Sequence, residues 1–243
     1  MSTTMSFLVV QHMPWEGPGV HLLRAAARLG VRFEIVEVWH RSMPDPTLSD
    51  GMIVLGGSPN VDEELEYPFL RAEKKAIRQV VEGGKAYLGF CLGHQLLGQV
   101  LGARVGSNFR RSVGFTEGSL TPAGRRHPLF RGLPDSFALF KWHGQAVLNP
   151  VPDHLEVLTT SPECGVEAIS LQGKPHVVGL QFDNHAASRK DAAVWLDADR
   201  EWLSRPPKVD PALVFGDAER LEDLMGRQFE ALFENFVSLC RGR

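Results

Sequence analysis

The segment spanning residues 86–101 constrains the fold of this chain most, because an apolar run there meets a helical pattern at one reactive residue, Cys91. Glycines stand two positions before and two positions after it, at Gly89 and Gly93. A tight strand-to-helix turn forces its central residue into a strained conformation in which neighbouring Cβ atoms would clash. We therefore predict a nucleophile elbow, with Cys91 between a buried strand at 86–90 and a helix at 93–101.

The predicted elbow also indicates reactivity. A thiol at a helix N-terminus lies near backbone N–H groups and the positive end of the helix dipole, which both favour thiolate. The N–H of Leu92 is free to hold an oxyanion. The alternative is a small buried cysteine that merely precedes a helix. Cys164 and Cys240 are far from Cys91 in the sequence, and we interpret them as buried or interface thiols.

Short apolar runs alternate with helical patterns along the chain. This alternation predicts an α/β fold with three layers, in which an open, mostly parallel sheet carries helices on both faces. The predicted strands are 7–10, 32–38, 52–55, 86–90, 137–142, 155–160, 165–170 and 177–182, and the predicted helices are 17–29, 69–82, 93–101, 188–203 and 217–239.

We expect one domain over residues 1–243, with a core at 5–187 and a C-terminal helical extension at 188–243. The last helix has one apolar stripe, formed by Leu221, Leu224, Met225, Phe229, Leu232, Phe233 and Phe236. Such a stripe predicts packing against the sheet, and a subunit interface is the alternative. We expect the functional site in the sheet core and not in the extension.

Composition excludes several classes of partner. The net charge is −3 and the pI is about 6.3, so no overall field attracts nucleic acid or acidic membranes. Residues 1–6 carry no positive charge, and no stretch approaches the ~20 apolar residues of a membrane span. The three cysteines form no metal spacing and leave an odd one over, which favours a reduced, cytoplasmic location. We expect no metal and no cofactor.

The elbow belongs to a wider pattern. The run from Gly89 to Gln95 resembles the G-x-C-x-G-x-Q signature of class I (triad) glutamine amidotransferases. Other stretches are similar to the stand-alone branch related to the glutaminase domain of GMP synthase, which implies a flavodoxin-like core. These stretches are Gln11 to Gly19, Gly56-Gly57-Ser58-Pro59, Glu66-Tyr67-Pro68, Lys141-Trp142-His143-Gly144 and Gly179-Leu180-Gln181-Phe182.

The resemblance implies a reaction and a set of roles. In the family, a cysteine attacks the side-chain amide of glutamine, forms a glutamyl thioester and releases ammonia. By position, Cys91 is the nucleophile, while Gly57 and Leu92 supply oxyanion N–H groups. Gln95 helps to hold the substrate, and His143 is expected to line the pocket. His94, inside the elbow helix, resembles a common structural choice.

The segment after the last strand departs from the family pattern. The family usually reads G-x-Q-F-H-x-E, where the histidine is the general base and the glutamate orients it. Here Asp183 stands where histidine is expected and His185 stands where glutamate is expected. In an extended segment the two residues share a face but lie ~7 Å apart, too far for His185 simply to replace the base. Gln145 also stands where an acid is usual.

The leading functional hypothesis is hydrolysis of the glutamine side-chain amide through a Cys91 thioester, with Asp183 and His185 as altered catalytic positions. One alternative is a hydrolase of other γ-glutamyl conjugates. The other is a catalytically silent relative that binds a ligand or partner. The expected partners are a small molecule, glutamine or a γ-glutamyl amide, and a separate synthase subunit, because no P-loop is present.

Overall fold

The computed structural model describes residues 4–242. The ends of the predicted domain, residues 1–3 and 243, lie outside that range. Residues 1–3 are also the first half of the uncharged segment 1–6. One sheet of nine strands forms the centre of the molecule, in the order β2-β1-β3-β4-β9-β8-β7-β5-β6. The strands are β1 Ser6–Gln11, β2 Arg32–Glu37, β3 Gly51–Val54, β4 Ala86–Phe90, β5 Val105–Leu120, β6 Ser136–Val147, β7 Leu155–Ser161, β8 Cys164–Leu171 and β9 Lys174–Leu180.

The two halves of the sheet differ in direction. Strands β2, β1, β3, β4 and β9 run parallel, whereas β8, β7, β5 and β6 pair antiparallel. The parallel half contains fully buried strands with continuous apolar runs, as expected where helices cover both faces. The predicted parallel sheet is therefore confirmed for the half that carries the elbow, and the other half makes the sheet mixed.

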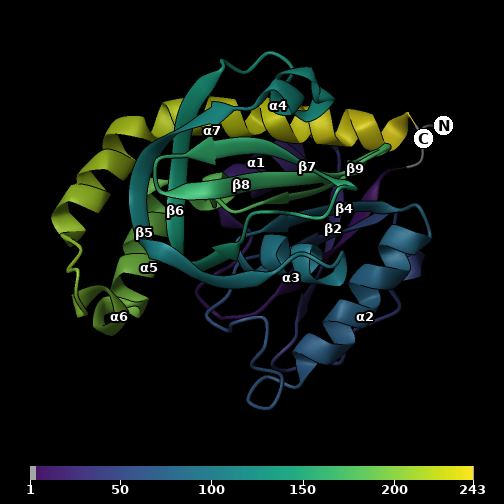
Figure 1. The fold of residues 1–243 in the computed structure, drawn as a ribbon, viewed down its shortest axis with the longest axis horizontal. Coiled ribbons are helices and arrows are strands. Elements are labelled where there is room, and N and C mark those ends of the chain that lie inside the picture. The colour runs from purple at the N-terminus through teal and green to yellow at the C-terminus, as the bar shows by residue number, and fades with distance from the viewer. Residues whose placement is uncertain (1–3, 243) are drawn as a thin grey trace.

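Helices cover both faces, which confirms the predicted three layers (Figure 1). One face carries α2 and α3, and the other carries α1 and α7, whose apolar side chains join those of the strands in two separate cores. The helices are α1 Gly19–Leu29, α2 Phe69–Glu82, α3 Leu92–Val100, α4 Pro122–Arg126, α5 Arg189–Ala198, α6 Arg200–Ser204 and α7 Pro211–Arg241, with short 3-10 turns at Pro46–Leu48, Pro128–Phe130 and Asn184–Ala186.

The longest strand, β5, is absent from the sequence prediction. Its 16 residues include several arginines and glycines, and much of it is half-buried or exposed, so no apolar alternation marks it. It forms because β6 pairs with it along most of its length, with a register shift between Ser107 and Ser112. Strand formation here depends on the partner strand and not on local sequence preference.

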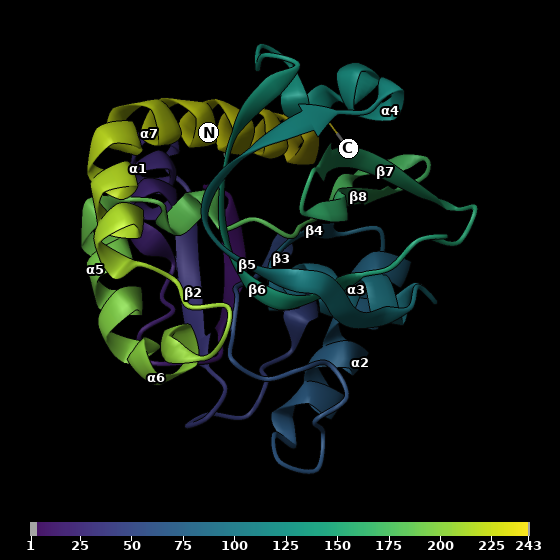
Figure 2. The same cartoon turned by 60° about the vertical axis from the view of Figure 1, so that its left-hand side comes forward.

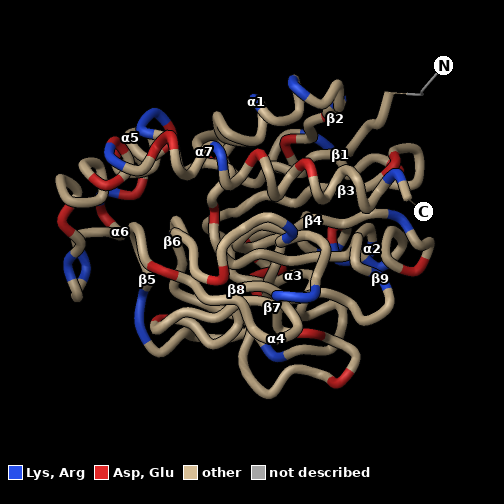
Figure 3. Tube along the Cα trace, turned by 90° about the horizontal axis from the view of Figure 1, so that it is seen from above, with Lys and Arg blue, Asp and Glu red and all other residues tan. Residues whose placement is uncertain are grey.

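Helices α5 and α6 and the start of α7 extend the molecule at the β5–β6 end of the sheet, and α7 then runs across the molecule beside α1 (Figures 1 and 2). The indole of Trp195 on α5 packs on Phe140 and Trp142 of β6. Most of the predicted stripe of α7 is buried, which confirms packing against the sheet, although Leu224 is exposed. Acidic and basic residues both occur along α5 and α6 (Figure 3). No helix in residues 4–242 is long and apolar enough to cross a membrane.

Candidate active site

The strand-to-helix elbow is present, and Cys91 occupies it. Cys91 has φ 45° and ψ −101°, and it is the one residue other than glycine with a positive φ in the described part of the chain. Such a conformation costs about 1–3 kcal/mol. A Cβ on Gly89 would lie 2.5 Å from the backbone of Gly93, and one on Gly93 would lie 2.3 Å from the Val54 carbonyl oxygen. Both glycines are therefore required for β4, α3 and β3 to approach so closely.

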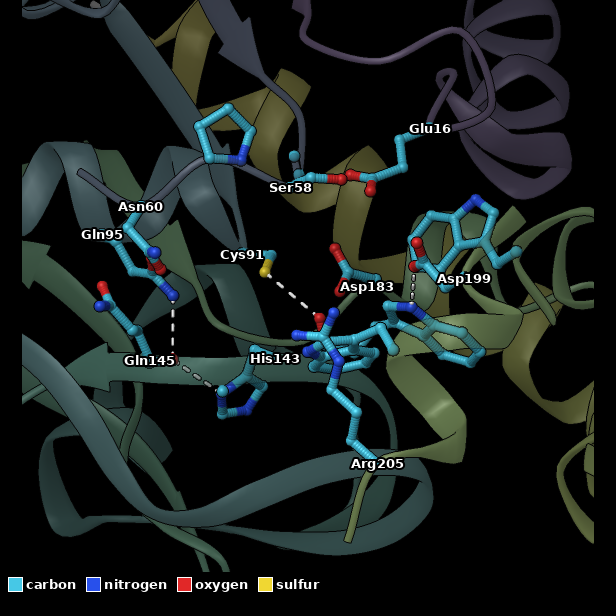
Figure 4. Close-up of a pocket in the computed structure, with 17 residues that line it drawn as sticks. Glu16, Ser58, Asn60, Cys91, Gln95, His143, Gln145, Asp183, Asp199 and Arg205 are labelled. Atoms are coloured by element: carbon cyan, nitrogen blue, oxygen red, sulfur yellow. Dashed lines mark hydrogen bonds between the residues drawn. The ribbon is translucent and has the colours of Figure 1, made fainter. Parts of the chain in front are cut away.

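Cys91 opens onto a pocket of about 360 Å³ (Figure 4). Its walls come from the β1–α1 loop, the loop after β3, the elbow, β6, the segment after β9, and the helices α5 and α6. The lining residues are Glu16, Gly56, Gly57, Ser58, Pro59, Asn60, Cys91, Gln95, Trp142, His143, Gly144, Gln145, Asp183, Trp195, Asp199, Trp202 and Arg205. The pocket thus contains most of the side chains that the sequence selected.

Two of the predicted site residues, Leu92 and His185, do not line the pocket. Leu92 directly follows Cys91 at the start of α3, whereas His185 lies farther away. The chain after β9 does not stay extended, because Asn184–Ala186 forms a 3-10 turn that carries the imidazole away from the pocket. The ring stacks on Phe90, with centroids 4.2 Å apart, and lies near Phe229 of α7. Neither ring nitrogen has a hydrogen-bond partner among the described residues. The assignment of His185 to the catalytic group is corrected here: its neighbours are core side chains.

Asp183 remains at the pocket and faces Cys91 (Figure 4). Its side chain is 1% exposed, and neither carboxylate oxygen has a hydrogen-bond partner among the described residues. Burial raises its pKa well above the usual range, and the Glu16 carboxylate raises it further. Asp183 is thus an unpaired acid beside the thiol.

The thiol of Cys91 is correspondingly hard to ionise. Burial raises the pKa of Cys91 well above its ordinary value, and Asp183 and Glu16 add to the effect, while the Leu92 N–H opposes it. The sulfur donates a hydrogen bond of 3.8 Å to the Trp142 carbonyl oxygen. The position of the thiol therefore fits a nucleophile, but its surroundings favour the neutral form at pH 7.

Two further carboxyl groups, those of Glu16 and Asp199, line the pocket together with Asp183. Burial, followed by repulsion from Asp199, raises the pKa of Glu16 to about 8. Burial also raises the pKa of Asp199, although its hydrogen bond from Trp142 Nε1, 2.6 Å long, opposes this. Burial is therefore the main cause of both shifts, and a neighbouring carboxylate adds to the shift of Glu16.

His143 and Gln95 lie on the opposite side of the pocket (Figure 4). Burial lowers the pKa of His143 well below its usual value, so its imidazole is neutral. Its Nδ1 lies 2.8 Å from the Gln145 carbonyl oxygen and donates to it, which leaves Nε2 as the acceptor nitrogen. Gln95 Nε2 donates to the same carbonyl oxygen at 2.9 Å. The unusual Gln145 thus holds both side chains through its backbone.

The loop that carries Gly56 and Gly57 rests on a buried ion pair. A Cβ on Gly57 would lie 2.8 Å from His12 Cβ, so only glycine fits there. His12 donates from Nδ1 to the Gly56 carbonyl oxygen at 2.7 Å and from Nε2 to Glu73 at 3.0 Å. Burial by itself would lower the pKa of His12, but Glu73, the Gly56 carbonyl oxygen and Glu16 together outweigh it, and the pKa is raised. Glu73, the polar exception on the apolar face of α2, thereby supports the loop.

The C-terminal extension supplies one wall of the pocket, which corrects the expectation that the sheet core alone holds the site. Trp195 and Asp199 come from α5 and its end, and Trp202 and Arg205 come from α6 and the residue after it. Arg111 of β5 fixes this segment in place. Its guanidinium donates to the carbonyl oxygens of Trp202, Leu203, Arg205 and Pro207, and it lies 4.8 Å from the Trp202 ring centroid.

Sequence reasoning missed Glu16, Asp199 and the three tryptophans of the pocket. Glu16 lies inside the stretch Gln11 to Gly19 and Trp142 inside Lys141 to Gly144, and both stretches carry the family resemblance, which was a usable signal. Nothing in the sequence of 195–205 marks a pocket wall, because its charges resemble those of a solvated helix. Among residues 4–242, no group of three or more His, Cys, Asp or Glu side chains is arranged to hold a metal ion.

Comparisons with known proteins agree with this geometry. The family model "Glutamine amidotransferase class-I" matches residues 20–191. A glutamine amidotransferase from Thermotoga maritima superimposes with a TM-score of 0.85 at 26% identity, covering 96% of this chain and 98% of the other. The chain belongs to the class I glutamine amidotransferase family.

Curated relatives match over shorter parts of their own length. The glutamine amidotransferase-like protein YfeJ of Salmonella typhimurium is 32% identical over 64% of this chain and 66% of its own length. A glutamine-hydrolyzing GMP synthase from Aeropyrum pernix is 31% identical over 84% of this chain and 37% of its own length. The chain therefore spans less than two thirds of the length of the first curated relatives that it matches.

Proposed function

We propose that this protein cleaves the side-chain amide of glutamine, or of a related γ-glutamyl amide, through a thioester on Cys91. The observation that carries the proposal is the strained elbow conformation of Cys91 at the wall of a pocket that also contains Gln95 and Gly57. A cysteine nucleophile splits such a reaction into two easier steps. Sulfur attacks the amide carbon, the nitrogen leaves with a proton as ammonia or amine, and water then releases glutamate.

The roles of the neighbouring groups follow from their chemistry. The N–H groups of Gly57 and Leu92 would stabilise the oxyanion. The carboxylate of Asp183, at the family's histidine position, would accept the thiol proton. Its raised pKa makes it a stronger base than an ordinary aspartate, but the pKa of the thiol is raised as well. We therefore expect slow turnover by the isolated chain.

The test measures ammonia release from glutamine by the native protein and by Cys91→Ser. Acid-quenched samples are examined by mass spectrometry for a glutamyl group on the peptide that contains Cys91. We expect slow ammonia release that disappears in Cys91→Ser, together with the adduct. Release that persists unchanged in Cys91→Ser would refute the proposal.

A second function is a ligand-binding relative without turnover. It is favoured by one observation, that no imidazole among the described residues forms a hydrogen bond with the Cys91 thiol in the structure. Calorimetric titration with glutamine separates the two functions. Saturable binding without ammonia release or adduct would favour the binding protein.

A partner is also part of the proposal. Relatives from Methanosphaera stadtmanae and Methanocaldococcus jannaschii are each named as one subunit of a glutamine-hydrolyzing GMP synthase. We propose that a separate synthase subunit receives the ammonia. Copurification, followed by ammonia-release assays with and without the copurified chain, would test this, and an increase in rate is expected from a genuine partner.

A further inference from the structure

The pocket has two chemically different sides, which lie on either side of Cys91 (Figure 4). The first side is neutral and carries amide groups from Asn60, Gln95 and Gln145, together with the uncharged His143. The second side carries carboxyl groups and indoles. We name it the acidic wall, and it consists of Glu16, Asp183, Asp199, Trp142, Trp195 and Trp202.

The three carboxyl groups of the acidic wall outnumber the cations that line the pocket, of which Arg205 is the one among the described residues. Both oxygens of Asp183 lack a hydrogen-bond partner among the described residues, although its side chain is almost completely buried and faces the pocket. Lys141 forms a buried ion pair with Glu167, and Arg205 is paired with Glu201 at 2.8 Å. The acidic wall therefore has more carboxyl groups than nearby cationic side chains that are free to pair with them.

The indoles make the same wall suitable for an organic cation. Trp142 and Trp195 meet edge to face with ring centroids 5.6 Å apart, and Trp202 lies 6.4 Å from Trp142. Indole is the best of the aromatic side chains at attracting a cation. Trp202 already has such a contact on one face, with the guanidinium of Arg111.

The wall is also rigidly built. Trp142 Nε1 donates to Asp199, Trp195 Nε1 donates to the Trp15 carbonyl oxygen at 3.1 Å, and Arg111 binds the carbonyl oxygens around Trp202. Groups that are held in place before a ligand arrives do not have to be ordered when it binds. This arrangement is typical of a binding site and not of a solvated surface.

We propose that the acidic wall binds an alkylammonium group, so that the preferred substrate is a γ-glutamyl amide whose amine part carries a second, positively charged amine. The proposal rests on the proposed function and deepens it, because it assigns the leaving group. The γ-glutamyl part would occupy the neutral side, with its amide carbon at Cys91. An ammonium ion between the carboxyl groups would also favour their ionised forms, whose pKa values are raised in the unliganded pocket.

The chemical step balances without any further reagent. The Cys91 sulfur bonds to the amide carbon, the carbon–nitrogen bond breaks, and the nitrogen leaves as an amine that takes the thiol proton. Water then cleaves the thioester, which yields glutamate and restores the thiol. With such a conjugate the released product would be a diamine, whereas glutamine would still release ammonia.

The test uses Cys91→Ser to prevent turnover and tryptophan fluorescence as the readout, because three of the five tryptophans form the wall. Two probes of equal length are compared: γ-glutamyl-aminobutylamide, which ends in an ammonium group, and γ-glutamyl-pentylamide, which ends in a methyl group. We expect the cationic probe to bind about tenfold more tightly, which corresponds to about 1.4 kcal/mol, because indoles and carboxylates attract a desolvated cation.

Variants locate the effect. Asp199→Asn, added to Cys91→Ser, should remove most of the preference and leave the neutral probe unchanged. The matched control is Asp197→Asn, two residues away, where the carboxylate is 77% exposed and outside the pocket. It should retain the preference.

The outcomes separate this inference from the proposed function. Equal affinity for the two probes, no binding of either, or an equal loss of preference in both aspartate variants would each overturn the inference. A preference for the cationic probe in a protein that never releases ammonia or amine would refute only the proposed function. Hydrolysis of glutamine without any preference would refute only the inference.

Discussion

The ring of His185 stacks on that of Phe90, the residue directly before Cys91, with centroids 4.2 Å apart. Asp183, two residues earlier, lines the pocket. The short turn between them therefore separates two side chains that an extended strand would have placed on one face. Compared with the family pattern, Asp183 and His185 have therefore not simply exchanged the roles of general base and orienting group.

Asp183→His is expected to increase glutamine hydrolysis. An imidazole at this position would replace an acid that opposes thiolate formation with a base suited to a thiol, and loss of such a base usually costs several powers of ten in rate. We expect at least about a tenfold rise in ammonia release. Adding His185→Glu should not help, because it would bury a carboxylate between Phe90 and Phe229 and destabilise the fold. An unchanged rate for Asp183→His would show that another group is the base.

Alkylation by iodoacetamide should report the surroundings of Cys91. Cys91 should react before Cys164 and Cys240, because it faces the pocket whereas the other two are buried elsewhere. Its raised pKa predicts slow reaction at neutral pH and acceleration as the pH rises. Asp183→Asn removes one source of repulsion, so we expect the midpoint of the pH–rate curve, followed by mass spectrometry, to move to lower pH. Asp197→Asn, far from the thiol on the surface, should leave it unchanged.

His185 should make the protein sensitive to acid. Burial lowers the pKa of His185 to about 3, from an ordinary value of 6.5. The unfolded chain therefore binds the proton more readily, and the contribution of His185 to stability is complete above pH 6.5 and declines as the pH falls toward 3. In His185→Leu, the slope of unfolding free energy against pH between 4 and 6 should decrease by up to about 1.4 kcal/mol per pH unit. An unchanged slope in urea titrations would contradict the buried, neutral state.

The His12–Glu73 pair predicts the opposite dependence on pH. Because the pKa of His12 is raised, its protonated form stabilises the fold below pH 6.5, and this contribution is lost as the pH rises through the raised value. Glu73→Gln should reduce stability at pH 6 more than at pH 9 and should also slow the Cys91 reaction, since the pair supports Gly56. Glu219→Gln, which breaks an exposed pair with Arg189, is the matched control and should do neither.

Much of the fold could be predicted from sequence because its signals are local. The glycines around Cys91 require close backbone approach, and the buried strands are continuous apolar runs, so the elbow and the parallel half of the sheet follow directly. β5 could not be predicted, because its pairing with β6 lies outside any local window. Glu73 illustrates an intermediate case: its position on an apolar face was visible in the sequence, but its partner, His12, was not.

The sequence by itself determined the turn at Cys91 and the family, since each depends on residue types at fixed spacing. The tertiary structure decided the surroundings of Cys91. It turned His185 into the core, left Asp183 unpaired at the pocket, and brought Asp199 and Trp202 from the C-terminal extension to the same site. The physical reason is that burial and the distances between charges arise only when segments far apart in the chain pack together, and these quantities set the pKa of Cys91 and the charge of its pocket.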